Sequence, residues 1–206
     1  KKLFTHQQKI NIKRLGREKT AVFLTISDTD SSLYRLASLF YTQALHTLCS
    51  LADKNPFHRL RIPVRFYLDD FASNVVIGDF DRIISVIRSR EISASVIIQS
   101  LSQLESIYGQ AKAMTILNNC DNVLCLGAGR DMETAKYISF QTNKPVSAIL
   151  NTPLNEAWLL TRGKPAEQVR KYDLKSHRLY NRLPETERAQ SGYEKNITEY
   201  QPEAMP

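Results

Sequence analysis

The fold of this chain is decided by one short stretch, Val64-Arg65-Phe66-Tyr67-Leu68-Asp69-Asp70, in which an apolar, β-rich run ends in two acids. Such a run is typical of a strand buried in a parallel sheet, whose last side chains project from the carboxyl edge. Open α/β sheets bind their ligands at that edge. A strand that ends in a solvated Asp-Asp turn has the same pattern, so the stretch alone leaves both interpretations open.

Strands and helices alternate on both sides of this stretch. Apolar runs at 21–26, 94–98 and 122–126 predict further strands, the first of them buried on both faces. Apolar residues at three- and four-residue spacing predict helices over about 33–51, 80–87, 101–118 (interrupted near Gly109) and 131–140. Strands alternating with helices form βαβ units, which predicts an α/β fold with a mainly parallel sheet flanked by helices.

The chain changes character after Pro145. Residues 157–161 and 168–172 predict a C-terminal β-hairpin around a turn at 162–165, in which Trp158 and Tyr172 serve packing. From residue 176 the sequence is polar with few apolar anchors, which predicts a loosely held tail.

The composition is that of a globular protein. Hydrophobic residues make up 42% and charged residues 24%, which excludes a fibrous or disordered chain. No apolar run approaches the roughly 20 residues that a membrane helix needs. Three cysteines form no CxxC pair, so we expect reduced thiols rather than a zinc site.

The net charge of +7 is concentrated in residues 1–19, which hold seven basic residues and one acid. That segment is either an arm for nucleic acid or anionic lipid or a solvated terminus.

The two acids have a specific chemical interpretation. In P-loop ATPases a buried strand that ends in acids is the Walker B element. Asp69 would hold Mg²⁺ on the nucleotide phosphates, usually through water. Asp70 would orient or activate the attacking water.

Three further polar residues flank the predicted strand at 94–98. Gln99 follows it, where a side chain can sense the γ-phosphate or position the water. It could equally belong to the start of the next helix, with Ser100 or Ser102 as the cap. Arg88 and Arg90 precede the strand, and either would reach a neighbouring subunit's nucleotide as an arginine finger. Alternatively, both complement the dipole at a helix C-terminus.

Two glycine-containing segments resemble phosphate-binding loops without matching them. In residues 16–20, Glu18 occupies the place of the glycine before the lysine, and the segment precedes a predicted strand, whereas a P-loop follows one. Gly127-Ala128-Gly129 follows a strand, but Met132 stands where the dinucleotide fingerprint requires a third glycine. We therefore find no P-loop in this sequence.

Several segments in a fixed order resemble one family. They are Thr25-Ile26-Ser27-Asp28-Thr29-Asp30, residues 65–72, Ile87-Arg88-Ser89-Arg90-Glu91-Ile92-Ser93, residues 97–104 and Asn119-Cys120-Asp121. The series is similar to the TraG/TraD-like coupling proteins of type IV secretion, in the branch found on conjugative elements of Gram-positive bacteria. The resemblance covers roughly residues 18–180.

The resemblance implies part of a RecA-like P-loop NTPase lobe from a hexameric, membrane-anchored ATPase on the cytoplasmic side of the membrane. Such proteins use ATP and Mg²⁺ to drive single-stranded DNA and its relaxase into a secretion channel. The implied partners are therefore single-stranded DNA, the relaxosome, the channel and further copies of the subunit. By position, Asp69 would be the Mg²⁺-associated acid, Asp70 the catalytic acid, Gln99 the sensor and Arg88 the arginine finger, with Arg90 its rival.

This sequence departs from the family pattern in two ways. The family usually has Glu where this chain has Asp70, whose side chain is one methylene shorter. The P-loop and the transmembrane anchor of the family are absent, so we expect a soluble fragment that neither binds ATP tightly nor hydrolyses it alone.

The expected division is a basic junction at 1–19, a motor lobe at 20–175 and a polar, flexible tail at 176–206. Two other interpretations stay open: a catalytically inactive module that binds the relaxosome or partner subunits, and a related motor such as a chromosome-segregation translocase.

Overall fold

The computed structural model describes residues 11–26, 31–73 and 75–182 and forms two compact units, residues 1–169 and 170–206. The first unit carries the sheets and the α-helices. In its described part, the second unit contains the short 3-10 helices Leu174–Ser176 and Tyr180–Arg182. None of the helices in the described ranges is long and apolar enough to cross a membrane. The division into a junction, a motor lobe and a tail remains a proposal.

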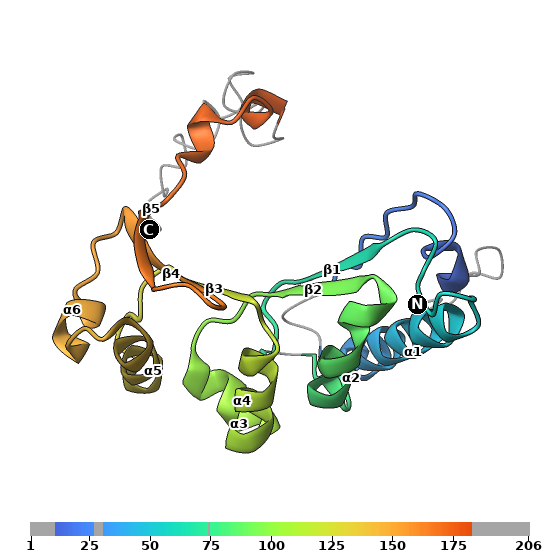
Figure 1. The fold of residues 1–206 in the computed structure, drawn as a ribbon, viewed down its shortest axis with the longest axis horizontal. Helices are drawn as coiled ribbons and strands as arrows, with labels where there is room; N and C mark the ends of the chain where they lie inside the picture. Colours follow the sequence, from blue (N-terminus) through green and yellow to red (C-terminus); the bar gives the residue numbers. More distant parts are fainter. Residues whose placement is uncertain (1–10, 27–30, 74, 183–206) are drawn as a thin grey trace, which may run out of the picture. The chain divides into compact units, whose positions relative to one another are not determined.

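A parallel pair of strands forms one of the two sheets of the first unit (Figure 1). Strand β1 (Val64–Leu68) pairs with β2 (Ile92–Val96), with Val64 opposite Ile92 and Leu68 opposite Val96. Helix α1 (Tyr34–Asp53) precedes the pair, and α2 (Phe80–Ile87) lies between its strands in the sequence. The predicted α/β fold with parallel strands and flanking helices is therefore confirmed.

A second sheet follows, and it differs from the prediction. After α3 (Leu101–Tyr108) and α4 (Gln110–Asn118), β3 (Asn122–Cys125) pairs antiparallel with β4 (Glu156–Thr161), beside β5 (Glu167–Arg170). Helices α5 (Met132–Thr142) and α6 (Val146–Leu150) lie between β3 and β4 in the sequence. The predicted hairpin thus exists, but it pairs with β3. Among the described residues no ladder joins β3 to β2.

The strand predicted at residues 21–26 is wrong. This segment forms no strand, and Phe23 is 92% exposed rather than buried. An apolar run indicates that a segment can enter a sheet, but a strand also needs a neighbour to complete its hydrogen bonds. Within the described ranges β1 pairs with β2 alone, and the segment joins neither strand.

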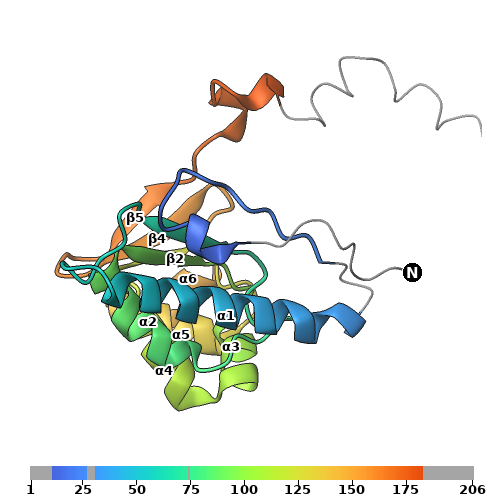
Figure 2. The same ribbon diagram turned by 90° about the vertical axis from the view of Figure 1, so that its right-hand side faces the viewer.

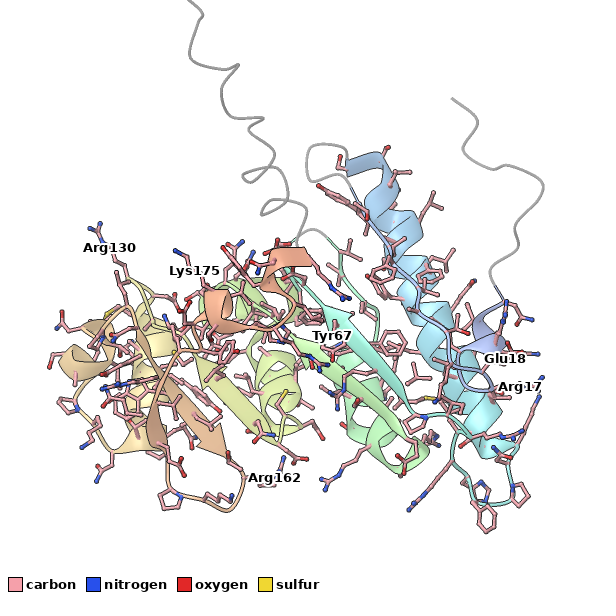
Figure 3. The ribbon with its side chains drawn as sticks, turned by 90° about the horizontal axis from the view of Figure 1, so that it is seen from above. Arg17, Glu18, Tyr67, Arg130, Arg162 and Lys175 are labelled. Carbon is pink, nitrogen blue, oxygen red and sulfur yellow. The ribbon has the colours of Figure 1, made fainter. Side chains whose placement is uncertain are left out.

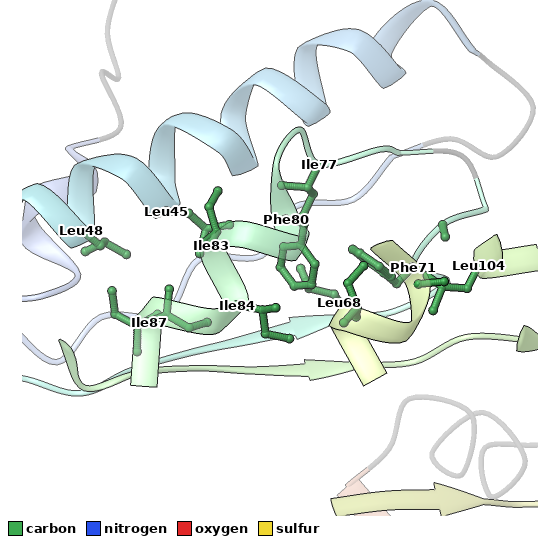
Figure 4. Packing of buried hydrophobic residues seen from close by; sticks show 14 of the residues in the cluster. Leu45, Leu48, Leu68, Phe71, Ile77, Phe80, Ile83, Ile84, Ile87 and Leu104 are labelled. Atoms are coloured by element: carbon green, nitrogen blue, oxygen red, sulfur yellow. The ribbon is translucent and has the colours of Figure 1, made fainter. Parts of the chain in front are cut away.

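The helices lie on one side of the sheets, where they enclose the core (Figures 1 and 2). Helix α2 has its apolar residues at three- and four-residue spacing, and Phe80, Ile83, Ile84 and Ile87 are all buried. They pack between α1 and the strands together with residues of β1 and α3 (Figure 4). Gly109 separates α3 from α4 as predicted, with a φ of 79° that suits glycine.

Two aromatic contacts connect this core to the loop after β1. Phe71 packs against Phe80 with 4.8 Å between ring centroids and stacks on Tyr108 at 5.5 Å. The Tyr108 hydroxyl accepts a hydrogen bond from the Ile77 N–H (3.0 Å) and donates one to the Ile77 carbonyl (3.3 Å). Burial raises the pKa of Tyr108 to about 12.

Phe80→Ala should destabilise the fold strongly, because its ring is fully buried in the core and packs against Phe71 in the loop after β1. We expect a loss of about 3–5 kcal/mol in the free energy of unfolding, measured by urea denaturation. Phe140→Ala is the matched control, since that ring is 86% exposed on α5. Equal losses in the two variants would contradict the assigned core.

Tyr108→Phe should cost about 1–3 kcal/mol at neutral pH, because it leaves the Ile77 N–H without its partner. The folded pKa of Tyr108 is raised, so its contribution is fully present below the unfolded pKa near 10. That contribution is lost as the pH rises from 10 through about 12. Urea unfolding at pH 8 and pH 11 should therefore show a smaller gap between wild type and variant at pH 11. The exposed Tyr67→Phe variant serves as the control, and a gap that does not depend on pH would rule out the buried hydroxyl as its cause.

Candidate functional site

The predicted Walker B acids lie directly after β1, in an exposed turn. Asp70 adopts a left-handed backbone conformation with φ 47°, which Asp and Asn tolerate better than most residues. The Asp69 carboxylate accepts the Asp70 N–H at 3.1 Å, and the Ser73 hydroxyl donates to the Asp70 carbonyl at 2.5 Å. These bonds hold the turn so that both carboxylates face solvent at the carboxyl edge of the parallel pair.

Gln99 reaches the same place from the neighbouring strand. Its side-chain Nε2 donates to Oδ1 of Asp70 at 3.3 Å, although the two residues are 29 apart in sequence. The contact follows from the parallel pairing, because β1 and β2 end at the same edge. The other interpretation, in which this region starts the next helix, also holds in part. The Ser100 hydroxyl caps α3 by accepting the Gln103 N–H at 3.2 Å.

The acids line a pocket of about 320 Å³. Its wall includes Leu24, Thr25 and Ile26 of the unpaired segment, together with Tyr34 and Tyr41 of α1. Tyr67 also contributes, and it lies on the sheet face seen from above in Figure 3. Carboxylate oxygens are the ligands that Mg²⁺ prefers, and the exposed pair leaves room for the waters that this ion retains. The donor set therefore fits a hydrated Mg²⁺.

The two arginines lie at the other edge of the parallel pair, because they precede β2 whereas the acids and Gln99 follow the strands. Arg90 is held by the Asp53 carboxylate at 2.8 Å and by the Val86 carbonyl at 2.9 Å, and its side chain is 25% exposed. Arg88 is 81% exposed, and its ion pair with Asp121 is longer, at 3.4 Å. The structure therefore does not bring the arginines and the acids of one chain together.

Asp121 also binds a second arginine that the sequence did not single out. Arg162 (Figure 3) donates from Nε to the Asp121 carboxylate at 2.7 Å and from Nη2 to the Asn118 carbonyl at 2.6 Å. No local signal marks this pair, because Asp121 and Arg162 are 41 residues apart.

The glycine-containing segments serve the fold. A Cβ at Gly16 would lie 2.9 Å from Leu60 and 3.1 Å from Leu51, so close packing accounts for this glycine. Gly127 and Gly129 adopt φ values of 137° and 57°, which let the chain turn between β3 and α5.

The sequence also did not single out Asp131, which connects two helices. It stands at the start of the helix predicted over 131–140; in the structure the helix begins at Met132 and Asp131 is its N-cap, with its carboxylate accepting the Thr134 N–H at 2.8 Å. The same carboxylate accepts a hydrogen bond from Ser102 of α3, at the start of the helix that follows Gln99. That second contact depends on tertiary structure alone.

Residues 63–144 match a protein family described as "TraM recognition site of TraD and TraG". No curated protein matches the sequence significantly. The matched range begins just before β1 and contains the acids, both arginines, Gln99 and Asp131.

The fold is similar to solved structures of conjugative coupling proteins. Against the plasmid coupling protein TrwB in complex with ADP and Mg²⁺, identity is 19% and the TM-score 0.54, over 68% of this chain and 36% of that one. Against the trigonal form of the bacterial conjugative coupling protein TrwBdeltaN70 with sulphate, identity is 21% and the TM-score 0.57, over 67% and 36%. This chain thus spans little more than a third of those structures.

Because the sequence identities are only 19–21%, the structural likeness establishes the fold alone. That fold matches part of the RecA-like fold of TrwB. The family match adds the sequence relationship over residues 63–144. Together they confirm the resemblance, seen in the sequence, to the TraG/TraD-like coupling proteins of type IV secretion.

Proposed function

We propose that this chain supplies the Walker B acids and the sensor of an ATP-driven motor that transfers DNA in bacterial conjugation. The observation that carries the proposal is the hydrogen bond from Gln99 to Asp70 at 3.3 Å, next to Asp69, at the carboxyl edge of two parallel strands. A polar side chain in contact with an acid at that edge is the arrangement that water-activating chemistry needs.

Each of the three residues has a distinct role in this proposal. Asp69 would hold Mg²⁺ through water, and the ion, when bound, neutralises charge on the nucleotide phosphates. The Asp70 carboxylate would accept a proton from the attacking water or orient it. The Gln99 amide, which already donates to Asp70, would position that water and respond to the γ-phosphate.

The arginines would act on a different subunit. Because they lie at the edge opposite the acids, neither could reach a nucleotide bound at Asp69 of its own chain. Arg88 is the better candidate for the finger, since it is mostly exposed and held by one long ion pair. Arg90 makes two short contacts within its own chain, which favours a structural role. The proposed motor is therefore an assembly of several subunits, hexameric in the intact parent.

The partners proposed for the intact parent are single-stranded DNA, the relaxase and its relaxosome, and the secretion channel at the membrane. The family description, a recognition site for TraM, favours contact with a relaxosome protein through residues 63–144. The same description supports a second candidate function, in which this chain is a catalytically inactive module that binds the relaxosome or partner subunits.

A protein extended upstream to include a P-loop should hydrolyse ATP, faster with single-stranded DNA, and Asp70→Asn should lower kcat on the order of 100-fold or more. Asn is the suitable replacement because it tolerates the left-handed conformation of Asp70 and removes only the charge. Steady-state phosphate release with and without single-stranded DNA measures the effect. Glu133→Gln, which alters an exposed acid paired with Lys136, should leave the rate unchanged. A folded, oligomeric extended wild type without turnover would favour the interaction module instead.

The 206-residue chain alone should neither bind ATP tightly nor hydrolyse it, because it lacks the backbone cradle and the lysine that hold the phosphates. Equilibrium titration with a fluorescent ATP analogue and a phosphate-release assay test this directly. Turnover above the buffer background that disappears in Asp70→Asn would contradict the prediction.

A further inference from the structure

Asp131 joins two helices whose first turns meet. From the N-cap position of α5, its Oδ2 accepts the Thr134 N–H at 2.8 Å and the Thr134 hydroxyl at 2.5 Å. Its Oδ1 accepts the hydroxyl of Ser102, which belongs to the first turn of α3. One carboxylate therefore receives hydrogen bonds from both helices.

Thr134 completes the connection in the opposite direction. Its hydroxyl donates to Asp131 and accepts the N–H of Leu101, the first residue of α3, at 2.9 Å. That N–H has no partner within its own helix, because the first four donors of a helix are unsatisfied. The residues are half-buried or buried, so few waters can replace these bonds.

The carboxylate is well suited to this role because it stays ionised. Burial acts to raise the pKa of Asp131, but the hydrogen bonds from Ser102 and Thr134 outweigh it and lower the pKa below its ordinary value. Charge-assisted hydrogen bonds of this kind are stronger than neutral ones.

These contacts fix one end of the segment that carries Gln99. At its start, Ile97 donates to the Leu68 carbonyl at 3.0 Å and accepts the Phe71 N–H at 2.8 Å. At its end, Leu101 is held by Thr134 of α5. Gln99 lies midway between these two anchors, and with both in place its side chain contacts Asp70.

We propose that Asp131, acting through Thr134 and Ser102, is a positioning residue that holds Gln99 within reach of Asp70. It would also connect the sensor mechanically to α5 and so to the second core, which α5 forms with α6 and β4. The catalytic consequence of this inference rests on the proposed function, whereas the positioning itself can be tested without nucleotide.

The first measurement uses the 206-residue chain. Thr134→Val keeps the volume of the side chain and the Asp131 cap on the Thr134 N–H, but it removes both hydroxyl contacts. We expect amide hydrogen exchange at residues 99–104 to become about 5- to 10-fold faster, as for one lost hydrogen bond. Thr142→Val is the matched control, since that hydroxyl donates within α5 to Ile138 at 2.8 Å and makes no contact with α3. Ser102→Ala should reproduce the effect with the α5 cap intact.

The second measurement uses the protein extended through the P-loop. Thr134→Val should lower kcat with little change in the KM for ATP, and it should cause no further loss when Gln99 is already replaced by Ala. Unchanged exchange at 99–104, or an equal loss of kcat in the Gln99→Ala background, would overturn the positioning role. If the extended wild type shows no turnover, the proposed function fails, and the exchange pattern then decides the positioning role by itself.

Discussion

The site depends on the parallel pairing of β1 with β2. Parallel strands of matched register end at the same edge, so this pairing places Asp70 and Gln99 side by side although they are 29 residues apart. The pairing is stable because α1, α2 and α3 bury its inner face, with Phe80 and Leu48 fully enclosed. Phe71 continues that core into the turn that carries the acids, so packing and chemistry share one scaffold.

The same constraint separates the acids from the arginines. Residues that precede a strand of a parallel pair lie at one edge, and residues that follow it lie at the other. Arg88 and Gln99 flank the same strand, so a single chain cannot direct both at one nucleotide. If Arg88 acts on a phosphate, that phosphate belongs to another subunit, and the ion pair with Asp121 must open first. Such an exposed pair contributes little stability and opens readily.

The second core has its own sheet, and it is connected to the first by Tyr137, which packs against both clusters, and by hydrogen bonds. Trp158, Ile138 and Ile149 pack together away from the parallel pair, and the Trp158 indole N–H donates to Thr152 at 3.0 Å. The bonds of Asp131, Thr134 and Ser102 cross from α5 to α3, and those of Arg162 cross from the end of β4 to Asp121 and Asn118. Hydrogen bonds depend on geometry more steeply than apolar contacts do, so these crossings can transmit small displacements.

The sequence by itself determined the local elements and the chemistry at the ends of the strands. Apolar spacing located α1, α2 and the break at Gly109, because helical period and glycine conformation are local properties. The order of Asp69, Asp70 and Gln99 after apolar runs sufficed to place them at one edge, since βαβ units are parallel. Only the tertiary structure decided that residues 21–26 form no strand, that β3 pairs with the hairpin, and that Asp131 reaches Ser102. Each of these depends on a partner tens of residues away, and a local pattern contains no information about which partner is in reach.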